Sequence, residues 1–134
     1  MPYLYYPDAR AAVEFLVDAF GFTEIEAFRD DEGNVWHAQL STGDGVVMVG
    51  PGLTDFGTRA PVEDEPATSR TFVYVDDVDA HCARARAKGA TIVTEPKISD
   101  YGEDYWSDKG YECVDPGGHH WWFAQRLRNP KPKG

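Results

Sequence analysis

Cysteine and long apolar runs are scarce in this sequence. Its two cysteines, Cys82 and Cys113, stand far apart and outside any CxxC pair, which argues against a disulfide framework or a zinc knuckle and favours buried free thiols. No apolar run reaches the about 18 residues that a transmembrane helix needs, and MPYLYYPDAR at the N-terminus does not resemble a signal peptide. We therefore expect a soluble, cytoplasmic protein that binds no membrane.

Basic residues are also few compared with acidic residues. The 134-residue chain has 13 Lys and Arg against 23 Asp and Glu, a formal net charge of −10. The C-terminal stretch RLRNPKPKG carries basic residues and no acidic one, so the rest of the chain is more acidic still. An acidic surface repels phosphate backbones and concentrates cations. We expect no nucleic-acid partner, although surplus carboxylates also serve solubility alone.

What the sequence has is enough apolar material for one core. Hydrophobic residues make up 42% and aromatic residues 13% of the chain, a composition typical of a packed globular protein. A chain of this length is too short for two ordinary domains. We predict a single domain over residues 1–134.

Two similar strand–helix units occur in the chain. Residues 3–8 (YLYYPD) and 72–77 (FVYVDD) alternate aromatic and aliphatic side chains and end at aspartate, the pattern of a short strand. A helix follows each strand. Asp8 can cap the first helix, and Asp76 or Asp77 can cap the second.

Apolar residues at helical spacing mark the inward face of each predicted helix. Gly21 and Gly89 stand where the helices should end, because glycine accepts the left-handed conformation found after a helix. The stripes are Ala12, Phe15, Leu16 and Ala19 in the first helix, and Val78, Cys82 and Ala85 in the second.

Three short strands are predicted after each helix, separated or preceded by the turns DDEGN, TGDG and DPGG. The order βαβββ therefore occurs twice, which makes the fold α+β. The predicted strands are 23–29, 35–41, 45–50, 91–96, 109–114 and 119–126. The corresponding divisions are module one at 1–50, a linker at 51–69, module two at 70–126 and a basic tail at 127–134.

Two long segments are predicted to be loops. The linker is rich in Gly, Pro and acidic residues, and its length would let one module pack against a neighbouring chain or let the loop cover a cavity. Residues 97–110 place Tyr101, Tyr105 and Trp106 among acidic residues. Exposed aromatic residues of a loop are candidates for ligand contact.

The paired βαβββ modules, the aspartate-capped helices, a YG loop and the final hairpin DPGGHHWWFAQ resemble the vicinal oxygen chelate superfamily. That superfamily holds glyoxalase I, ring-cleaving dioxygenases and bleomycin resistance proteins. The final hairpin is most similar to that of the phosphonate-operon-type (PhnB-like) subgroup. The resemblance spans residues 3–126 and implies a curved mixed sheet around a cavity, helices on the outer face, and a homodimer.

The resemblance also implies where a metal would bind. Metal-dependent members supply ligands from the first and last strands of each module. Counted from local landmarks, these positions hold Met1, Met48 or a neighbouring valine, Arg70 and Trp122. Arginine stays protonated and repels a cation, and the lone pair of an indole nitrogen belongs to its ring. We therefore expect no metal and no other cofactor.

The four histidines have different expected roles. His37 lies on a predicted strand, and His81 shares a helical face with Arg84 and Lys88, where we expect it to be solvated. His119 resembles the turn histidine of the family and is expected to serve the hairpin. His120 shares the alternation of Trp122 and is expected to face the cavity; adjacent strand residues point to opposite faces, so the pair HH is no two-ligand clamp.

Alternation along the strands predicts an aromatic face toward the cavity. The opposite face, under the helices, is assigned Leu4, Tyr6, Val73, Val75, Trp121 and Phe123. Trp36 or its neighbours can add to the cavity from the third strand, and these rings either hold a ligand or simply fill the interior. The candidate ligand-binding residues are Tyr3, Tyr5, Trp36, Met48, Arg70, Phe72, Tyr74, Trp106, His120 and Trp122.

The sequence leaves the charge of the ligand open. Stacked rings favour a planar or cationic compound. Arg70 favours an anionic group, unless it pairs with an acid of the protein such as Glu112 or Glu26. His120 can also transfer protons without a metal.

Three functions are compatible with this pattern. The first is a metal-free protein that binds and sequesters a planar or cationic small molecule. The second is a metal-dependent lyase or dioxygenase of the glyoxalase I type whose ligands lie elsewhere in the chain. The third is a structural or regulatory dimer with a filled cavity. Whether the protein is an enzyme stays open.

Overall fold

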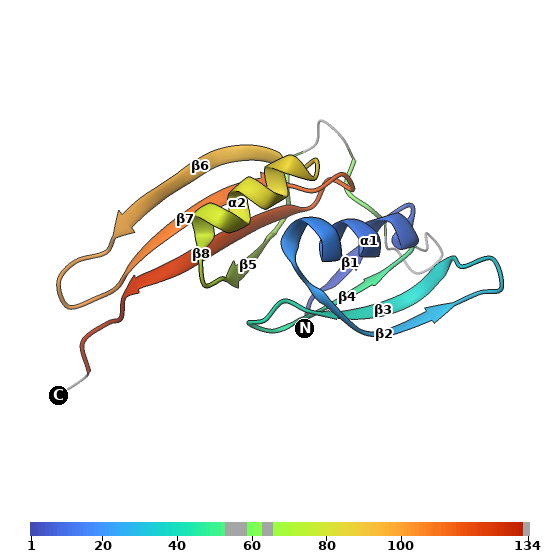
Figure 1. Ribbon diagram of the computed structural model, residues 1–134, viewed down its shortest axis with the longest axis horizontal. Helices are drawn as coiled ribbons and strands as arrows, with labels where there is room; N and C mark the ends of the chain where they lie inside the picture. The colour runs from blue at the N-terminus through green and yellow to red at the C-terminus, as the bar shows by residue number, and fades with distance from the viewer. Residues whose placement is uncertain (53–58, 63–65, 133–134) are drawn as a thin grey trace.

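The computed structural model describes residues 1–52, 59–62 and 66–132, and its fold is α+β (Figure 1). The prediction that βαβββ occurs twice is confirmed. Parts of the predicted linker, residues 53–58 and 63–65, lie outside the described residues. The elements are β1 (Tyr3–Tyr5), α1 (Ala9–Phe20), β2 (Thr23–Arg29), β3 (Val35–Ser41), β4 (Val46–Gly50), β5 (Arg70–Tyr74), α2 (Val78–Ala87), β6 (Thr91–Asp100), β7 (Ser107–Val114) and β8 (His120–Arg128).

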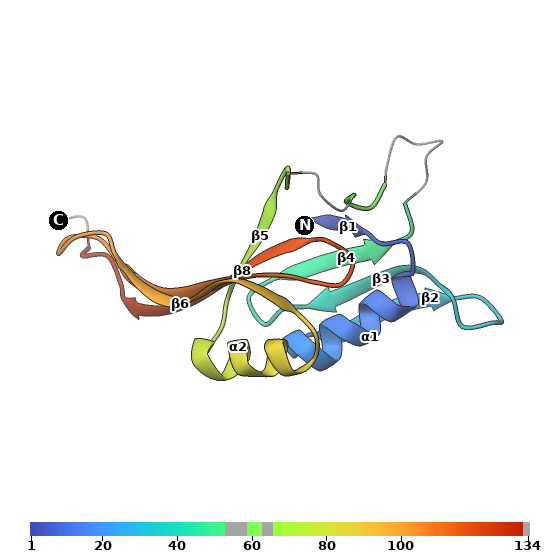
Figure 2. The same cartoon turned by 90° about the horizontal axis from the view of Figure 1, so that it is seen from above.

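Each module forms its own four-stranded mixed sheet. The strand orders are β1-β4-β3-β2 and β5-β8-β7-β6. The first strand of each module runs parallel to the last, and the other pairs are antiparallel. Both helices lie on the same side of the molecule, so each sheet has one covered and one open face (Figure 2). Neither helix is long and apolar enough to span a bilayer.

The helices begin and end at the predicted kinds of residue. The carboxylate of Asp8 accepts a hydrogen bond from the backbone N–H of Ala11 at 3.1 Å. Asp77, and not Asp76, caps α2 in the same way, through the N–H of Ala80. Gly21 follows α1 with φ at 75°, a left-handed conformation that costs glycine little.

The core lies between the sheets and the helices, as strand alternation predicts. Leu4, Tyr6, Val73, Trp121 and Phe123 are all buried there. One core joins the two modules, because rings of the first module contact rings of the second. Phe20 lies 5.4 Å from Trp121 and 4.8 Å from Phe123 between ring centroids.

The predicted loop at 97–110 is wrong in its extent. β6 runs to Asp100 and β7 begins at Ser107, so most of the segment is a hairpin that extends away from the helices (Figure 1). β8 likewise runs to Arg128, beyond the predicted end of module two. Cross-strand pairing explains both extensions, because Ser107 pairs with Asp100 on one side and Arg128 on the other.

Candidate ligand-binding site

The open face of the second sheet carries half of the predicted binding residues. Strand register places Arg70 beside His120 and Phe72 beside Trp122, on parallel strands β5 and β8. Phe72 is 50% exposed. Gly110 on β7 lacks a side chain where the indole of Trp122 lies: a Cβ there would approach Nε1 to 2.7 Å. The missing side chain therefore lets the indole lie close against the sheet.

A charged cluster of Arg70, Glu112 and His120 occupies one end of this face. The Arg70 guanidinium donates to Glu112 Oε1 at 2.7 Å, and His120 Nδ1 lies 3.0 Å from Oε2. Burial alone would raise the pKa of Glu112, but the hydrogen bonds from His120 and Arg70 outweigh it, and the pKa is lowered. Of the two acids that the sequence offered to Arg70, Glu112 is its partner.

A second cation, Arg126 of β8, lies among rings farther along the same face. Its Nε donates to Asp108 at 2.7 Å, and the Tyr74 hydroxyl is 3.2 Å from the other oxygen of this carboxylate. The guanidinium carbon lies 4.9 Å from the Tyr74 ring centroid and 6.0 Å from that of Trp106. Sequence reasoning missed Arg126 and Asp108. Arg126 and Trp122 are four residues apart on one strand, so alternation predicts that their side chains share a face, and this signal could have identified the arginine.

The open face of the first sheet is also aromatic. Tyr3 and Tyr5 stack with ring centroids 4.9 Å apart, and Met48 lies beside Tyr3 in the register of β1 and β4. The Tyr3 hydroxyl is 3.0 Å from Nδ1 of His37. Burial, and then the neighbouring Tyr5, raise the pKa of Tyr3, so its phenol is neutral in water at physiological pH.

Trp36 does not join this contact. It is 65% exposed and lies at a register shift, where Phe28 pairs with His37 and Arg29 pairs with Val35. The extra residue changes the alternation of β3. His37, its neighbour, is therefore the residue of this strand that contacts Tyr3.

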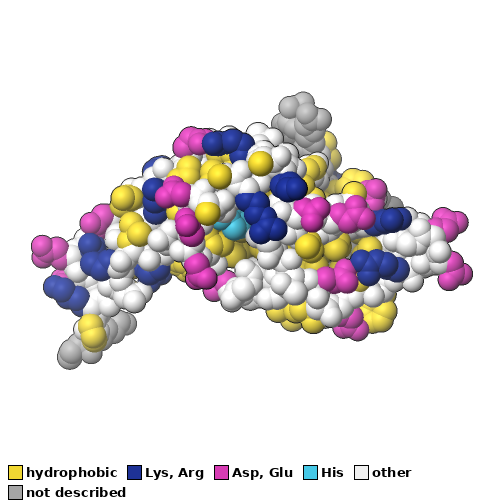
Figure 3. Space-filling view, in the orientation of Figure 1, with side chains coloured by type: hydrophobic (Ala, Val, Ile, Leu, Met, Phe, Trp, Pro, Cys, Tyr) yellow, Lys and Arg dark blue, Asp and Glu magenta, His cyan; other side chains and the backbone are white. Residues whose placement is uncertain are grey.

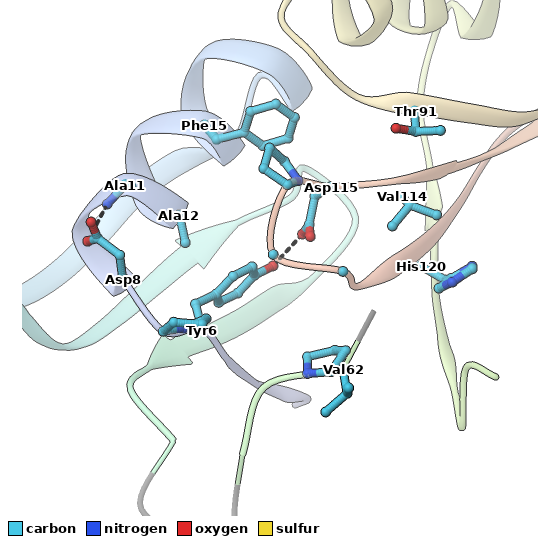
Figure 4. Close-up of a pocket in the computed structure, with 15 residues that line it drawn as sticks. Tyr6, Asp8, Ala11, Ala12, Phe15, Val62, Thr91, Val114, Asp115 and His120 are labelled. Atoms are coloured by element: carbon cyan, nitrogen blue, oxygen red, sulfur yellow. Dashed lines mark hydrogen bonds between the residues drawn. The ribbon is translucent and has the colours of Figure 1, made fainter. Parts of the chain in front are cut away.

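Two hollows meet at His120. One of about 410 Å³ is lined by Tyr3 and Tyr5 together with His119 and His120 and parts of the linker. The other, of about 790 Å³, is the crease between α1 and the DPGG turn, and Figure 4 shows Tyr6, Phe15 and Val62 around it with His120 at one side. Both volumes fall in the range of small-molecule sites.

Tyr6 lines the larger hollow and His119 the smaller one, and their ring centroids lie 4.5 Å apart. The Tyr6 hydroxyl donates to the buried carboxylate of Asp115 at 2.5 Å (Figure 4). Trp121 Nε1 donates to the same carboxylate at 2.9 Å. His119 Nε2 is 2.7 Å from the carbonyl oxygen of Tyr5. His119 therefore joins the final hairpin to β1, which extends its expected hairpin role.

The prediction that His81 is solvated is wrong. Its Nδ1 lies 2.6 Å from the Tyr111 hydroxyl and its Nε2 lies 3.0 Å from the carbonyl oxygen of Phe20. The imidazole is 4.1 Å from the Phe123 ring centroid. Packing of α2 against α1 and β7 places this helical position in the interior.

The residues at the metal positions of the family do not fit a metal. Arg70 is paired with Glu112, and its guanidinium carbon is 5.6 Å from the ring centroid of Trp122, which itself offers no lone pair. Met1 is 74% exposed. Within the described ranges, no three His, Cys, Asp or Glu side chains gather as a metal site would require.

Charge is mixed across the helix-bearing face. Figure 3 shows acidic and basic side chains interspersed there, with apolar side chains between them. Several of these charges form ion pairs, such as Arg86 with Glu95 on α2 and β6. The acidic surplus is therefore not concentrated on this face as one patch.

The chain belongs to the glyoxalase/bleomycin resistance protein/dioxygenase superfamily, whose family model matches residues 2–123. The uncharacterized proteins Mb0911c of Mycobacterium bovis and Rv0887c of Mycobacterium tuberculosis are each 31% identical to it over 130 residues. These matches cover 95% of this chain and 82% and 74% of the two relatives, respectively.

Solved structures share the fold. TioX from Micromonospora sp. ML1 is 33% identical, with a TM-score of 0.71 over 95% of this chain and 98% of that one. A glyoxalase/bleomycin resistance protein/dioxygenase family enzyme from Burkholderia phytofirmans PsJN has a TM-score of 0.69 at 23% identity, covering 93% of this chain and 95% of its own. The second likeness concerns the fold alone.

Proposed function

We propose that this protein is a metal-free, dimeric binding protein that sequesters a planar small molecule, neutral or cationic, on the aromatic faces of its sheets. The observation that supports this most is the open face of the second sheet. Phe72 and Trp122 lie there as neighbours and in part exposed, and both cations of that face, Arg70 and Arg126, have acidic partners. Flat rings stack on flat ligands, and a cationic ligand gains about 0.5–2 kcal/mol from each cation–π contact.

Pairing of the two arginines weakens the case for an anionic ligand. A ligand carboxylate would have to displace Glu112 from Arg70 or Asp108 from Arg126. Displacement would leave a partly buried carboxylate without its partner, which is costly. The net charge of −10 also favours cations over anions in the surrounding solution.

A second copy of the chain completes the site in this proposal. Phe28, Trp36 and Phe72 are each at least half exposed, which is unusual for large rings on sheets of a monomer. Apposition of the open faces of two chains would cover these rings and leave a closed cavity.

The cytoplasmic location, the PhnB-like subgroup and a role in antibiotic resistance belong to the same proposal.

Binding is tested by equilibrium dialysis or calorimetry against bleomycin-like, mitomycin-like and simpler flat cations such as acridines, with planar carboxylates of similar size as the contrast. We expect flat cations or neutral compounds to bind and carboxylates to bind at least tenfold more weakly. Trp122→Ala should weaken binding about 2- to 30-fold, the loss of one stacking contact. Tyr105→Ala, at the exposed tip of the β6–β7 hairpin, is the matched control.

Two results would contradict the proposal. The first is the absence of binding to every planar compound, together with a crystal structure in which the open faces are filled by the protein's own side chains. The second is about one equivalent of nickel, zinc, manganese or iron per purified chain, which would favour a metal-dependent enzyme of the glyoxalase I type.

A further inference from the structure

His120 has one ring nitrogen engaged and one available. Its Nδ1 lies 3.0 Å from Glu112 Oε2. Nε2 has no hydrogen-bond partner among residues 1–52, 59–62 and 66–132. The side chain is 27% exposed, so the free nitrogen is neither sealed in the core nor fully solvated.

Glu112 determines which nitrogen of His120 carries the proton. An ionised carboxylate only accepts hydrogen bonds, and Glu112 already accepts one from Arg70 at 2.7 Å. The lowered pKa of Glu112, in which the two hydrogen bonds outweigh the opposing effect of burial, agrees with an ionised group. Nδ1 must therefore donate, and a neutral His120 has its lone pair on Nε2.

The position of His120 makes this lone pair useful to a ligand. The imidazole lines the 410 Å³ hollow with Tyr3 and Tyr5, and it also borders a third hollow, of about 420 Å³, with Arg70 and Glu112. In strand register, His120 lies next to Trp122 on the same face of β8. A ring stacked on these aromatic groups would present its edge to the imidazole.

We propose that His120, oriented by Glu112, is the hydrogen-bond acceptor that selects planar ligands carrying an N–H or O–H donor at their edge. This inference rests on the proposed function, since it names the group that hydrogen-bonds to the edge of the ligand held by the aromatic faces. Glu112 acts as a positioning residue and Arg70 keeps it ionised. The ligand class is narrowed to planar phenols, hydroxy-heterocycles and aromatic amides or amines.

A matched pair of probes tests the inference. 6-Hydroxyquinoline and 6-methoxyquinoline share a ring system and differ in the donor. Calorimetry at pH 8 should show the hydroxy compound binding about five- to tenfold more tightly to the intact protein, the effect of one hydrogen bond. His120→Phe should abolish this preference, so that the two compounds bind with equal affinity.

Two further variants separate recognition from general damage. Tyr105→Ala, at the exposed tip of the β6–β7 hairpin, should keep the preference, because Tyr105 lines none of the hollows that border His120. Glu112→Gln should reduce the preference, since an amide can hydrogen-bond to either tautomer of His120. If circular dichroism shows that His120→Phe does not fold, His120→Met provides the same loss of the acceptor.

The outcomes distinguish the two proposals. Equal binding of both quinolines, or a preference that persists without His120, overturns the role of His120 and leaves the binding function in place. Failure of both quinolines and of every planar compound tested above to bind overturns both. A preference that disappears in the His120 variants, is reduced in Glu112→Gln and persists in the Tyr105→Ala control supports the inference.

Discussion

His81 is held neutral by its surroundings. Burial, and then the nearby charge of Arg84, lower its pKa, while the hydrogen bond to the Phe20 carbonyl acts in the opposite direction. The Tyr111 hydroxyl, which hydrogen-bonds to His81, has a pKa raised first by burial and is neutral at neutral pH. Protonation of His81 would place a cation in this partly buried contact between α1 and α2.

This environment predicts a pH dependence of stability. Because the folded pKa lies below the unfolded value of about 6.5, the unfolded chain binds the proton more readily. The contribution of His81 to the free energy of unfolding should be fully present above about pH 6.5 and be lost as the pH falls through the folded pKa. Urea unfolding from pH 8 to pH 5 should show this loss, and His81→Gln should show less of it. Identical pH profiles for the two proteins would contradict the assignment.

Asp115 joins three donors in the interior. Its carboxylate accepts hydrogen bonds from the Tyr6 hydroxyl, Trp121 Nε1 and the backbone N–H of His119. Burial, together with the charge of Asp115, raises the pKa of Tyr6, so the phenol remains a donor. Asp115 is only 4% exposed, so water has little access to replace the hydrogen bonds that its carboxylate accepts.

Asp115→Ala should lower the free energy of unfolding by about 3–5 kcal/mol, because two buried side-chain donors and one partly buried backbone N–H lose their acceptor. Tyr6→Phe removes one donor and leaves the carboxylate with two others, so we expect a loss of about 1 kcal/mol. Urea or thermal unfolding measures both. A loss below about 1 kcal/mol for Asp115→Ala would mean that the carboxylate is not the centre of this network.

The two helices are joined end to end by Arg84 of α2. Its Nε donates to the carbonyl oxygen of Asp18 at 2.8 Å, and a terminal nitrogen lies 3.4 Å from the carbonyl oxygen of Val17. Carbonyls of the last helical turn have no partner within the helix, so a cation there satisfies them and opposes the helix dipole. This contact connects the two modules at the level of their helices.

Arg84→Ala should destabilise the protein by about 1–2 kcal/mol through the loss of these charge-assisted bonds. Arg86→Ala is the matched control on the same helix. Arg86 pairs with exposed Glu95, and an exposed ion pair contributes little to stability. Comparable destabilisation by the two changes in chemical unfolding would argue against a special role for Arg84.

The hairpin of β6 and β7 shows what sequence alone could not give at the level of an element. Pro96 interrupts the alternation of β6, and the pairing skips from Thr94 to Lys97 at this point. A register shift is where a sheet tolerates a residue without an N–H. From the local sequence pattern, Pro96 therefore predicts the end of a strand. The strand continues because β7 offers partners beyond it, as in the pair of Asp100 with Ser107.

At the scale of the whole molecule, the open faces predict self-association. Phe72→Asp places a charge in the proposed interface, and should convert a dimer into a monomer, because burial of an unpaired carboxylate is costly. Ala83→Asp adds the same charge at an exposed position of α2 and should leave the dimer intact. Light scattering coupled to size-exclusion chromatography measures the mass. If the unchanged protein is a monomer in solution, the proposal that a second chain completes the site is wrong.

The sequence by itself determined the two βαβββ modules, the helix caps and the division of each strand into a covered and an open face. These follow from period-two and helical patterns and from Asp and Gly at helix ends, which are properties of neighbouring residues. Tertiary structure alone decided that Arg70 pairs with Glu112, that Arg126 lies against Tyr74, and that His81 is enclosed. Such contacts join residues 30 to 52 positions apart, and a local pattern carries no information about which partners the packing will bring within reach.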